Sequence, residues 1–102
     1  MNAPERLWRG LAARDWVAVR SQFHANAEVE WPHAGRRMPV DEYVATARER
    51  AGGRDVSVRR VVSEGRNVVV EAHVGDAACA GFYDLHDGLI AGAVEYWIGE
   101  AA

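Results

Sequence analysis

A chain of 102 residues has the usual length of one domain, and its 49% hydrophobic and 26% charged residues are the ordinary balance of a globular protein. The formal net charge of −3 gives no electrostatic footprint for nucleic acids or anionic membranes, so we expect neither as a partner. One cysteine excludes an intramolecular disulfide. No apolar run approaches the roughly 20 residues of a membrane span. No signal peptide is visible either, so we expect one cytoplasmic domain over residues 1–102.

Three short helices are predicted in the first half of the chain. Residues 4–13 and 16–23 carry apolar side chains three and four positions apart, as on one face of a helix, and Asp15 is a suitable N-cap between them. Residues 41–51 repeat this spacing up to Gly52, which is followed by a second glycine and ends the helix. Helices this short are marginal alone, so we expect them to cover another element.

The rest of the pattern is typical of strands. Residues 28–31 alternate polar and apolar side chains and precede Pro32, which predicts a short edge strand. Runs rich in β-branched residues, separated by turn signals, predict four further strands at 56–62, 68–74, 79–86 and 89–98. Asp87-Gly88 between the last two runs is a strong hairpin signal.

The predicted order of elements is α-α-β-α-β-β-β-β, which is the α+β class. We expect the three N-terminal helices to pack on one face of a strongly curved antiparallel sheet, with bends at Gly75, Gly81 and Gly92. A curved sheet closed by short helices leaves an internal cavity. We expect that cavity to bind a small apolar organic ligand.

Four local strings carry a resemblance to a known family: Ala13–Trp16, Glu30–Pro32, Tyr83–Ile90 and Glu95–Trp97. In their order and spacing along the whole chain, they resemble the SnoaL-like branch of the nuclear transport factor two-like superfamily. The resemblance implies a cystatin-like α+β cone with a pocket between sheet and helices, often paired as a homodimer through the sheet. It implies no single activity, because the superfamily includes polyketide cyclases, ketosteroid isomerase, limonene epoxide hydrolase, scytalone dehydratase and non-enzymatic binding modules.

Glu95 is the first candidate for chemistry, because a carboxyl group in an apolar strand is desolvated and its pKa moves toward neutrality. In cyclase relatives an acidic residue of the equivalent strand serves as general acid/base, and the resemblance implies that Glu95 stands where the family usually has Asp. Counting back from a two-residue turn at Asp87-Gly88, however, puts Glu95 on the same sheet face as Phe82 and Asp84. We expect that to be the outer face, unless a β-bulge turns Glu95 inward.

His24 and His73 are the other titratable candidates. His24 is expected at the end of the second helix near the pocket mouth, where it is also favourable to the helix dipole. His73 shares a strand face with Glu71, so a surface or interface His–Glu pair is the alternative to a catalytic role. The sequence shows no metal-binding spacing, no phosphate-binding loop and no nucleophile motif, so we expect no metal and no cofactor.

Aromatic residues from several elements are expected to line the pocket, namely Trp16, Trp31, Tyr43, Tyr83 and Trp97. Two functions are compatible with such a pocket. A cofactor-free isomerase, polyketide cyclase-like or epoxide hydrolase-like enzyme needs an enclosed cavity of roughly a few hundred Å³, with Glu95, His24 or a tyrosine pointing into it. A non-catalytic binding module needs only apolar walls or a filled interior, with Glu95 and His73 outside. Under both functions we expect a homodimer, because the outer sheet face would be apolar.

Overall fold

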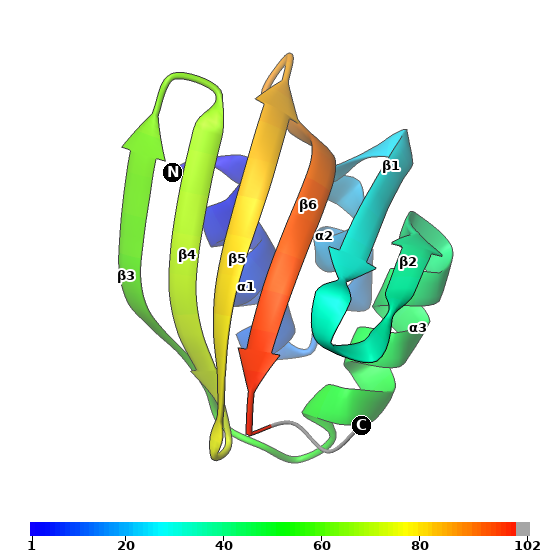
Figure 1. Ribbon diagram of the computed structural model, residues 1–102, viewed down its shortest axis with the longest axis vertical. Coiled ribbons are helices and arrows are strands. Elements are labelled where there is room, and N and C mark those ends of the chain that lie inside the picture. The colour runs from blue at the N-terminus through cyan, green and yellow to red at the C-terminus, as the bar shows by residue number, and fades with distance from the viewer. Residues whose placement is uncertain (100–102) are drawn as a thin grey trace.

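The computed structural model describes residues 1–99 and shows three α-helices on one side of a six-stranded sheet (Figure 1). The elements in chain order are α1 (Ala3–Ala13), α2 (Trp16–Ser21), β1 (Phe23–Trp31), the 3-10 turn η1 (Pro32–Ala34), β2 (Arg36–Pro39), α3 (Val40–Ala51), β3 (Val56–Glu64), β4 (Asn67–Val74), β5 (Ala77–His86) and β6 (Leu89–Ile98). The strand order across the sheet is β2-β1-β6-β5-β4-β3. The predicted α+β class with N-terminal helices is therefore confirmed.

The sheet differs from the prediction at its β1 end. The sequence predicted an edge strand over 28–31 in a wholly antiparallel sheet, but β1 begins at Phe23, lies between β2 and β6, and pairs parallel with β6. The edge position belongs to β2, which the sequence did not predict, so the order is α-α-β-β-α-β-β-β-β. Gly35, at a φ of 62°, reverses the chain after η1. The four residues of β2, too few for a hydrophobic pattern, then pair antiparallel with β1.

The second helix is shorter than predicted and ends at Ser21. The carbonyl of Gln22 accepts a hydrogen bond from the backbone N–H of Ile90 in β6, and Phe23 pairs with the same residue in the sheet. Phe23 and His24 therefore belong to β1, because pairing with a distant strand overrides the local helical spacing.

Local capping explains the helix ends. Asn2 and Glu5 form a capping box at the start of α1, and Asp15 caps α2, as predicted, by accepting a hydrogen bond from the backbone N–H of Ala18. The last helix, α3, ends at Gly52, whose φ of 48° is rarely adopted by residues with a side chain.

The three hairpins that join β3, β4, β5 and β6 all have two-residue turns. Asp87 and Gly88 form the predicted turn with φ angles of 51° and 80°, both positive as in a type I′ turn. Gly75, predicted at a sheet bend, is instead the first residue of the β4–β5 turn, at a φ of 57°.

A β-bulge near the start of β6 decides which sheet face receives Glu95. Leu85 pairs with Ile90, but the residue before Leu85 pairs with Gly92, so Ala91 is one extra residue in β6. The extra residue shifts the alternation of side chains by one position. Glu95 therefore points inward, and the prediction of an outer-face position is wrong because it counted the strand without a bulge.

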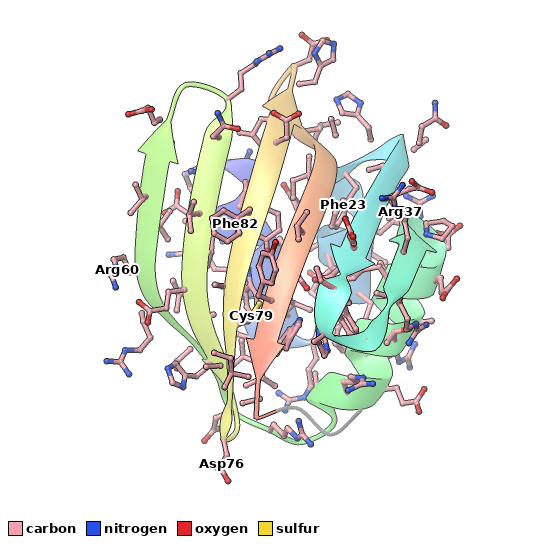
Figure 2. All side chains as sticks on the ribbon, viewed as in Figure 1. Phe23, Arg37, Arg60, Asp76, Cys79 and Phe82 are labelled. Carbon is pink, nitrogen blue, oxygen red and sulfur yellow. The ribbon has the colours of Figure 1, made fainter. Side chains whose placement is uncertain are left out.

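The two faces of the sheet have opposite character. The inner face lies under the helices and is buried, as the alternating side chains of Val68, Val70 and Ala72 show. The outer face exposes Phe82 and Tyr96 by 46% and 49%, and Figure 2 shows Phe82 on the side turned to the viewer. Among residues 1–99, no helix is both long and apolar enough to cross a membrane.

Candidate functional site

Glu95 is the one carboxylate side chain that is buried within residues 1–99, and its exposed fraction is 0%. Its Oε1 atom accepts hydrogen bonds from the indole Nε1 atoms of Trp31 at 3.0 Å and Trp97 at 3.4 Å. Its Oε2 atom accepts from the hydroxyl groups of Tyr83 at 2.6 Å and Tyr43 at 3.0 Å. Four neutral donors, from β1, α3, β5 and β6, thus replace water around one carboxylate.

The two oxygens of this carboxylate differ in what they can do. An indole N–H only donates, so Oε1 has to remain an acceptor. A phenol hydroxyl both donates and accepts, so Oε2 can carry a proton and donate it to Tyr43 once that hydroxyl has rotated. The hydrogen-bond pattern of the cluster is therefore complete for the ionised carboxylate, and in the protonated state the Tyr43 hydroxyl proton turns away from Glu95.

Tyr83 reaches Glu95 by lying across Gly81. Gly81 is paired directly with Glu95 between β5 and β6, and Tyr83 is two residues further along the same inward face. A Cβ atom on Gly81 would lie 2.3 Å from the Tyr83 hydroxyl oxygen and 2.6 Å from two of its ring carbons. The glycine therefore provides the space through which the phenol reaches the carboxylate.

Trp8 of α1 extends the cluster to the helical layer. Its Nε1–H donates to the Tyr83 hydroxyl at 2.9 Å, so Tyr83 accepts one hydrogen bond and donates another. The Trp8 side chain is fully buried, and its ring centroid lies 6.1 Å from that of Trp97. The chain of hydrogen bonds from Trp8 through Tyr83 to Glu95 thereby ties α1 to the centre of the sheet.

Burial dominates the electrostatics of the cluster. Removal from water raises the pKa of Glu95 above its ordinary value of 4.5, and the hydrogen bonds, led by the one from Tyr83, partly offset the rise. Burial, together with the charge of Glu95, raises the pKa values of Tyr43 and Tyr83 well above 10.0. The phenols therefore stay protonated at neutral pH. A buried carboxyl group with a raised pKa is the kind of group that general acid/base catalysis uses.

A cavity lies beside this cluster, between the helices and the sheet. Its volume is about 30 Å³, which is room for about two water molecules and far below the roughly 300–1,000 Å³ of pockets for drug-sized ligands. Leu11, Ala47 and Val74 contribute apolar walls from α1, α3 and β4. The apolar walls fit the binding-module hypothesis, and the small volume does not fit the enzyme hypothesis. Glu95 is not outside, as the binding module needed, but it does not line the cavity, as the enzyme needed; of the groups expected there, the tyrosine Tyr43 does.

Three of the five aromatic residues expected in the pocket line this cavity, namely Trp31, Tyr43 and Trp97. Tyr83 lies behind them, against the carboxylate. Trp16 is half-buried on α2 and lines a separate surface groove between α2 and α3.

Neither candidate histidine reaches the carboxylate. His24 lies in β1 instead of at a helix end, and its Nε2–H donates to the backbone carbonyl of His86. His73 lies on the outer face of the sheet, where it is paired with Ser57 and Ala78 of the neighbouring strands. Neither histidine lines the cavity.

Sequence reasoning missed three contributors to the site. Trp8 was visible only as part of an apolar helical stripe, and Gly81 only as a glycine in a strand, although its place two residues before Tyr83 was readable. Arg50 of α3 lines the cavity with its guanidinium carbon 5.3 Å from the centre of the Trp31 ring. Nothing in the sequence distinguishes Arg50 from the other arginines.

Comparison with known families adds to this geometry. The family model described as SnoaL-like domain matches residues 5–93, from the first turn of α1 to the bulged part of β6. The chain belongs to the SnoaL-like domain family. The resemblance read from the sequence is thereby confirmed. Among curated proteins, none matches this SnoaL-like chain.

Solved structures share the SnoaL-like fold of this chain at low sequence identity. An NTF-2 like protein of unknown function from Burkholderia xenovorans LB400 has a TM-score of 0.84 at 21% identity, over 98% of this chain and 84% of that one. A putative ketosteroid isomerase from Kribbella flavida DSM 17836 has a TM-score of 0.79 at 20% identity, over 98% and 78%. A hypothetical protein with a ketosteroid isomerase-like fold from Catenulispora acidiphila DSM 44928, in complex with trimethylamine, has a TM-score of 0.73 at 13% identity, over 92% and 83%. At these identities the likeness shows the fold alone.

Proposed function

We propose that this SnoaL-like domain binds a small, mainly apolar organic molecule in the cavity between α1, α3 and the sheet. The observation that carries the proposal is the orientation of three aromatic side chains. Trp31, Tyr43 and Trp97 line the cavity, while their N–H and O–H groups point to Glu95. The cavity therefore offers ring surface to a ligand, and the Glu95 cluster holds that surface in place.

The complex of the Catenulispora neighbour with trimethylamine supports this proposal, because that protein has the same fold and binds a small molecule.

The volume of about 30 Å³ limits a ligand that enters without structural change to very few atoms. A larger ligand has to widen the cavity, so we expect binding to be accompanied by a movement of one wall.

Filling the cavity tests the proposal with a matched control on the same helix. Ala47 lines the cavity and Ala45 is exposed on α3. Saturation-transfer NMR with two neutral probes, cyclohexanone and benzyl alcohol, is expected to show binding to the unaltered protein and to Ala45→Leu, and none to Ala47→Leu. Absence of binding by the unaltered protein, or equal binding by both variants, would contradict the proposal.

Acid/base catalysis is the second candidate function, favoured by the two phenols on Oε2 of Glu95. With Glu95 protonated, Oε2–H donates to Tyr43, whose own proton then turns toward a ligand oxygen in the cavity. Tyr43 can pass this proton to a carbonyl oxygen and recover one from Glu95. Because Glu95 does not line the cavity, the proton that the substrate carbon loses returns to the carboxylate through the Tyr43 hydroxyl. The reverse relay then delivers a proton to the second carbon and takes back the one on the substrate oxygen, and the raised pKa of Glu95 suits such a cycle.

Isomerisation of cyclohex-3-enone to cyclohex-2-enone tests this second candidate, because one proton leaves carbon 2 and one is gained at carbon 4. Tyr43→Phe removes the cavity-lining hydroxyl and is expected to lower kcat by about 10²–10⁴-fold. Tyr96→Phe, which removes a hydroxyl on the outer face, is expected to leave kcat unchanged. No reaction with the unaltered protein, or equal rates in both variants, would leave binding as the function.

A second copy of the chain is the partner we propose for the outer face of the sheet. Val62, Phe82 and Tyr96 are exposed there by 54%, 46% and 49%. The same face carries both members of the Arg60–Glu71 ion pair, so two copies can meet without an excess of one charge. Sedimentation at tens of micromolar is expected to show a dimer for the unaltered protein and for Phe82→Leu, and a monomer for Phe82→Asp. A monomeric unaltered protein would contradict the proposal.

A further inference from the structure

We propose that Trp8 is a positioning residue of the Glu95 cluster: its indole N–H fixes Tyr83 as a donor to the carboxylate, so that a proton on Glu95 is donated to Tyr43 alone. This inference rests on the acid/base function proposed above as the second candidate, and it names the residue that gives the proton path one direction. The N–H of Trp8 donates to Tyr83 and not to Glu95, so Trp8 acts through the phenol.

The hydroxyl of Tyr83 is held between two buried partners. It accepts from Nε1 of Trp8 at 2.9 Å and donates to Oε2 of Glu95 at 2.6 Å, the shortest of the four hydrogen bonds to this carboxylate. An indole N–H cannot accept, so of these two partners only Glu95 can take the Tyr83 proton. A rotated Tyr83 hydroxyl would point a buried proton toward another donor, which is unfavourable in the interior.

The hydroxyl of Tyr43 is not held in this way. Within residues 1–99 its one hydrogen-bond partner is Glu95, at 3.0 Å. When Oε2 carries a proton, the Tyr43 oxygen can accept it, since no N–H donor occupies that oxygen. Tyr83 is therefore a permanent donor to the carboxylate and Tyr43 a reversible one, and Tyr43 is the phenol that lines the cavity.

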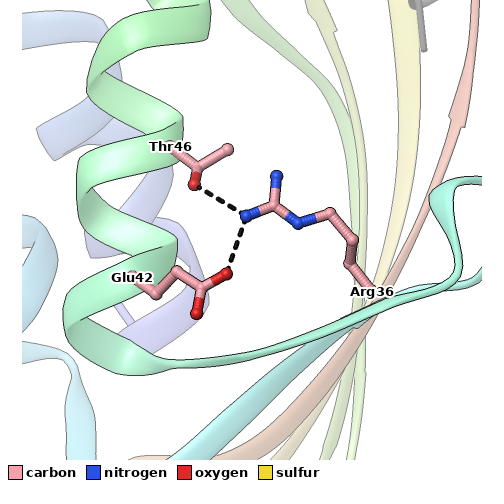
Figure 3. Close-up of polar contacts among 3 residues, drawn as sticks. All are labelled: Arg36, Glu42 and Thr46. Carbon is pink, nitrogen blue, oxygen red and sulfur yellow. Dashed lines mark hydrogen bonds and ion pairs between the residues drawn. The ribbon is translucent and has the colours of Figure 1, made fainter.

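The surroundings of Tyr43 hold its ring in place while its proton turns. The residue before it, Glu42, and Thr46, one helical turn further on, both accept hydrogen bonds from Arg36 of β2, at 2.7 Å and 3.4 Å (Figure 3). The ring itself packs edge-on against Phe23 of β1, with 5.5 Å between the ring centres. Rotation of the hydroxyl group is thus the one movement of Tyr43 that the proton path needs.

Trp8 also makes Tyr83 a stronger donor. A hydroxyl group that accepts one hydrogen bond is polarised and donates another more strongly. The bond from Tyr83 is the one that most opposes the burial-driven rise in the pKa of Glu95. Without the N–H of Trp8, this bond weakens and the Tyr83 oxygen becomes free to accept from a protonated Glu95. Both changes favour the protonated carboxyl group, so Trp8 helps Glu95 to release its proton.

The other titratable or charged groups around Glu95 do not act in this way. They are Tyr43 of α3, Tyr83 and Cys79 of β5, and two arginines against the Trp31 ring, Arg36 of β2 and Arg50 of α3. The phenols stay protonated at neutral pH. The two guanidinium groups adjoin an indole that donates to Oε1, whereas the proton of Glu95 is carried on Oε2.

NMR titration of the Glu95 carboxyl carbon in two variants of α1 tests the inference. Trp8→Phe removes the N–H that Tyr83 accepts, whereas Leu11→Ala, on the same helix, removes apolar packing and leaves this bond in place. We expect the midpoint of Glu95 to rise in Trp8→Phe and not to rise in Leu11→Ala. Water that entered the space left by the indole would lower the midpoint, because hydration favours the ionised form. A fall or no change in Trp8→Phe, or an equal rise in both variants, would overturn the inference.

A double-mutant cycle shows whether Trp8 acts through Tyr83. Tyr83→Phe removes the hydroxyl between the indole and the carboxylate, so it should raise the midpoint by itself. Trp8→Phe added to Tyr83→Phe should then leave the midpoint where it is. A further rise as large as that in the single variant would show that Trp8 does not act through the phenol.

The unaltered protein provides a measurement that does not depend on the folding of any variant. With tyrosine labelled with ¹³C at Cζ, a change of pH through the midpoint of Glu95 is expected to shift the Tyr43 signal more than the Tyr83 signal, since only Tyr43 changes from donor to acceptor. Equal shifts, or a larger one for Tyr83, would overturn the inference. These titrations need no substrate, so a lack of isomerase activity would remove the second candidate function and leave the role of Trp8 to be decided by them.

Discussion

On strands β5 and β6 the two faces of the sheet carry residues that polarity alone would place the other way round. Glu95 is fully buried, whereas the next residue, Tyr96, is 49% exposed. On β5 the phenol of Tyr83 is buried while Phe82 is 46% exposed. On β6 the bulge at Ala91 decides the face of each later residue, and hydrogen bonds compensate the burial of the carboxylate that it turns inward.

Removing the inner carboxylate is expected to have the largest effect. Glu95→Ala should lower the free energy of unfolding by about 3–5 kcal/mol, because buried indole and phenol donors lose their acceptor. On the outer side, Glu71→Ala removes an exposed partner of Arg60 and should cost about 0.5 kcal/mol or less. Urea denaturation followed by circular dichroism measures both values. Similar losses for the two variants would break the contrast between the faces.

Replacing a glycine by alanine, which adds one methyl group, should cost much more stability on the inner face than on the outer face. Gly81→Ala places a Cβ atom against the ring of Tyr83 and should cost about 2–3 kcal/mol through overpacking and loss of the bond to Glu95. At Gly92 no atom lies within 4 Å of a Cβ, so Gly92→Ala should change stability by about 0.5 kcal/mol or less. Thermal unfolding of the pair provides the comparison, and a tolerated alanine at Gly81 would contradict the position assigned to Tyr83.

Removing single tyrosine hydroxyl groups should give smaller losses of stability, which differ with the number of hydrogen bonds lost. Tyr83→Phe removes the bond to Glu95 and also leaves the N–H of Trp8 without its acceptor, so it should cost about 2 kcal/mol. Tyr43→Phe removes one bond and should cost about 1 kcal/mol. Tyr96→Phe on the outer face should cost almost nothing. Denaturant unfolding of the three variants is expected to give this order, and an equal cost for Tyr83 and Tyr43 would show that the Trp8 contact adds nothing.

The pH dependence of stability is the smallest expected effect. Because burial raises the pKa of Glu95 in the folded state above 4.5, the folded protein holds this proton more tightly than the unfolded chain does. The stabilising contribution is therefore complete below about pH 4.5 and is lost as the pH rises through the folded pKa. Glu95→Gln lacks this titration, so the stability of the unaltered protein relative to Glu95→Gln should fall with rising pH. If the stability of the unaltered protein relative to Glu95→Gln rises with pH, the pKa of Glu95 is lowered on folding, and the account of the buried carboxyl group is contradicted.

The sequence predicted the parts of this fold that local signals determine. Asp15 is the cap of α2, and Asp87-Gly88 is the two-residue turn, because each follows from the conformational preference of one or two residues. The pairing of Phe23 with β6 and the short strand β2 were not predicted, since both depend on contacts with distant segments. The SnoaL-like family was readable because its motifs follow one another along the chain.

The sequence predicted which residues belong to the candidate site, but it did not predict how they are arranged. Glu95, Trp31, Tyr43 and Trp97 were all singled out, but their convergence requires the bulge at Ala91. Gly92, where the sequence predicted a bend, follows the extra residue, but a glycine in a strand does not by itself distinguish a bulge from a bend. A single inserted position reverses every later side chain in a strand, so counting residues from a turn cannot decide the face. The role of Gly81 likewise depends on where the ring of Tyr83 lies, which only the folded structure shows.

The most direct test of the central claim is the titration of the Glu95 carboxyl carbon by NMR, with glutamate labelled with ¹³C and the signal assigned by its absence in Glu95→Gln. We expect a midpoint above 4.5, and we expect the indole N–H signals of Trp31 and Trp97 to shift with the same midpoint. A midpoint at or below 4.5, with both indole signals unchanged, would contradict a buried carboxylate held by aromatic donors.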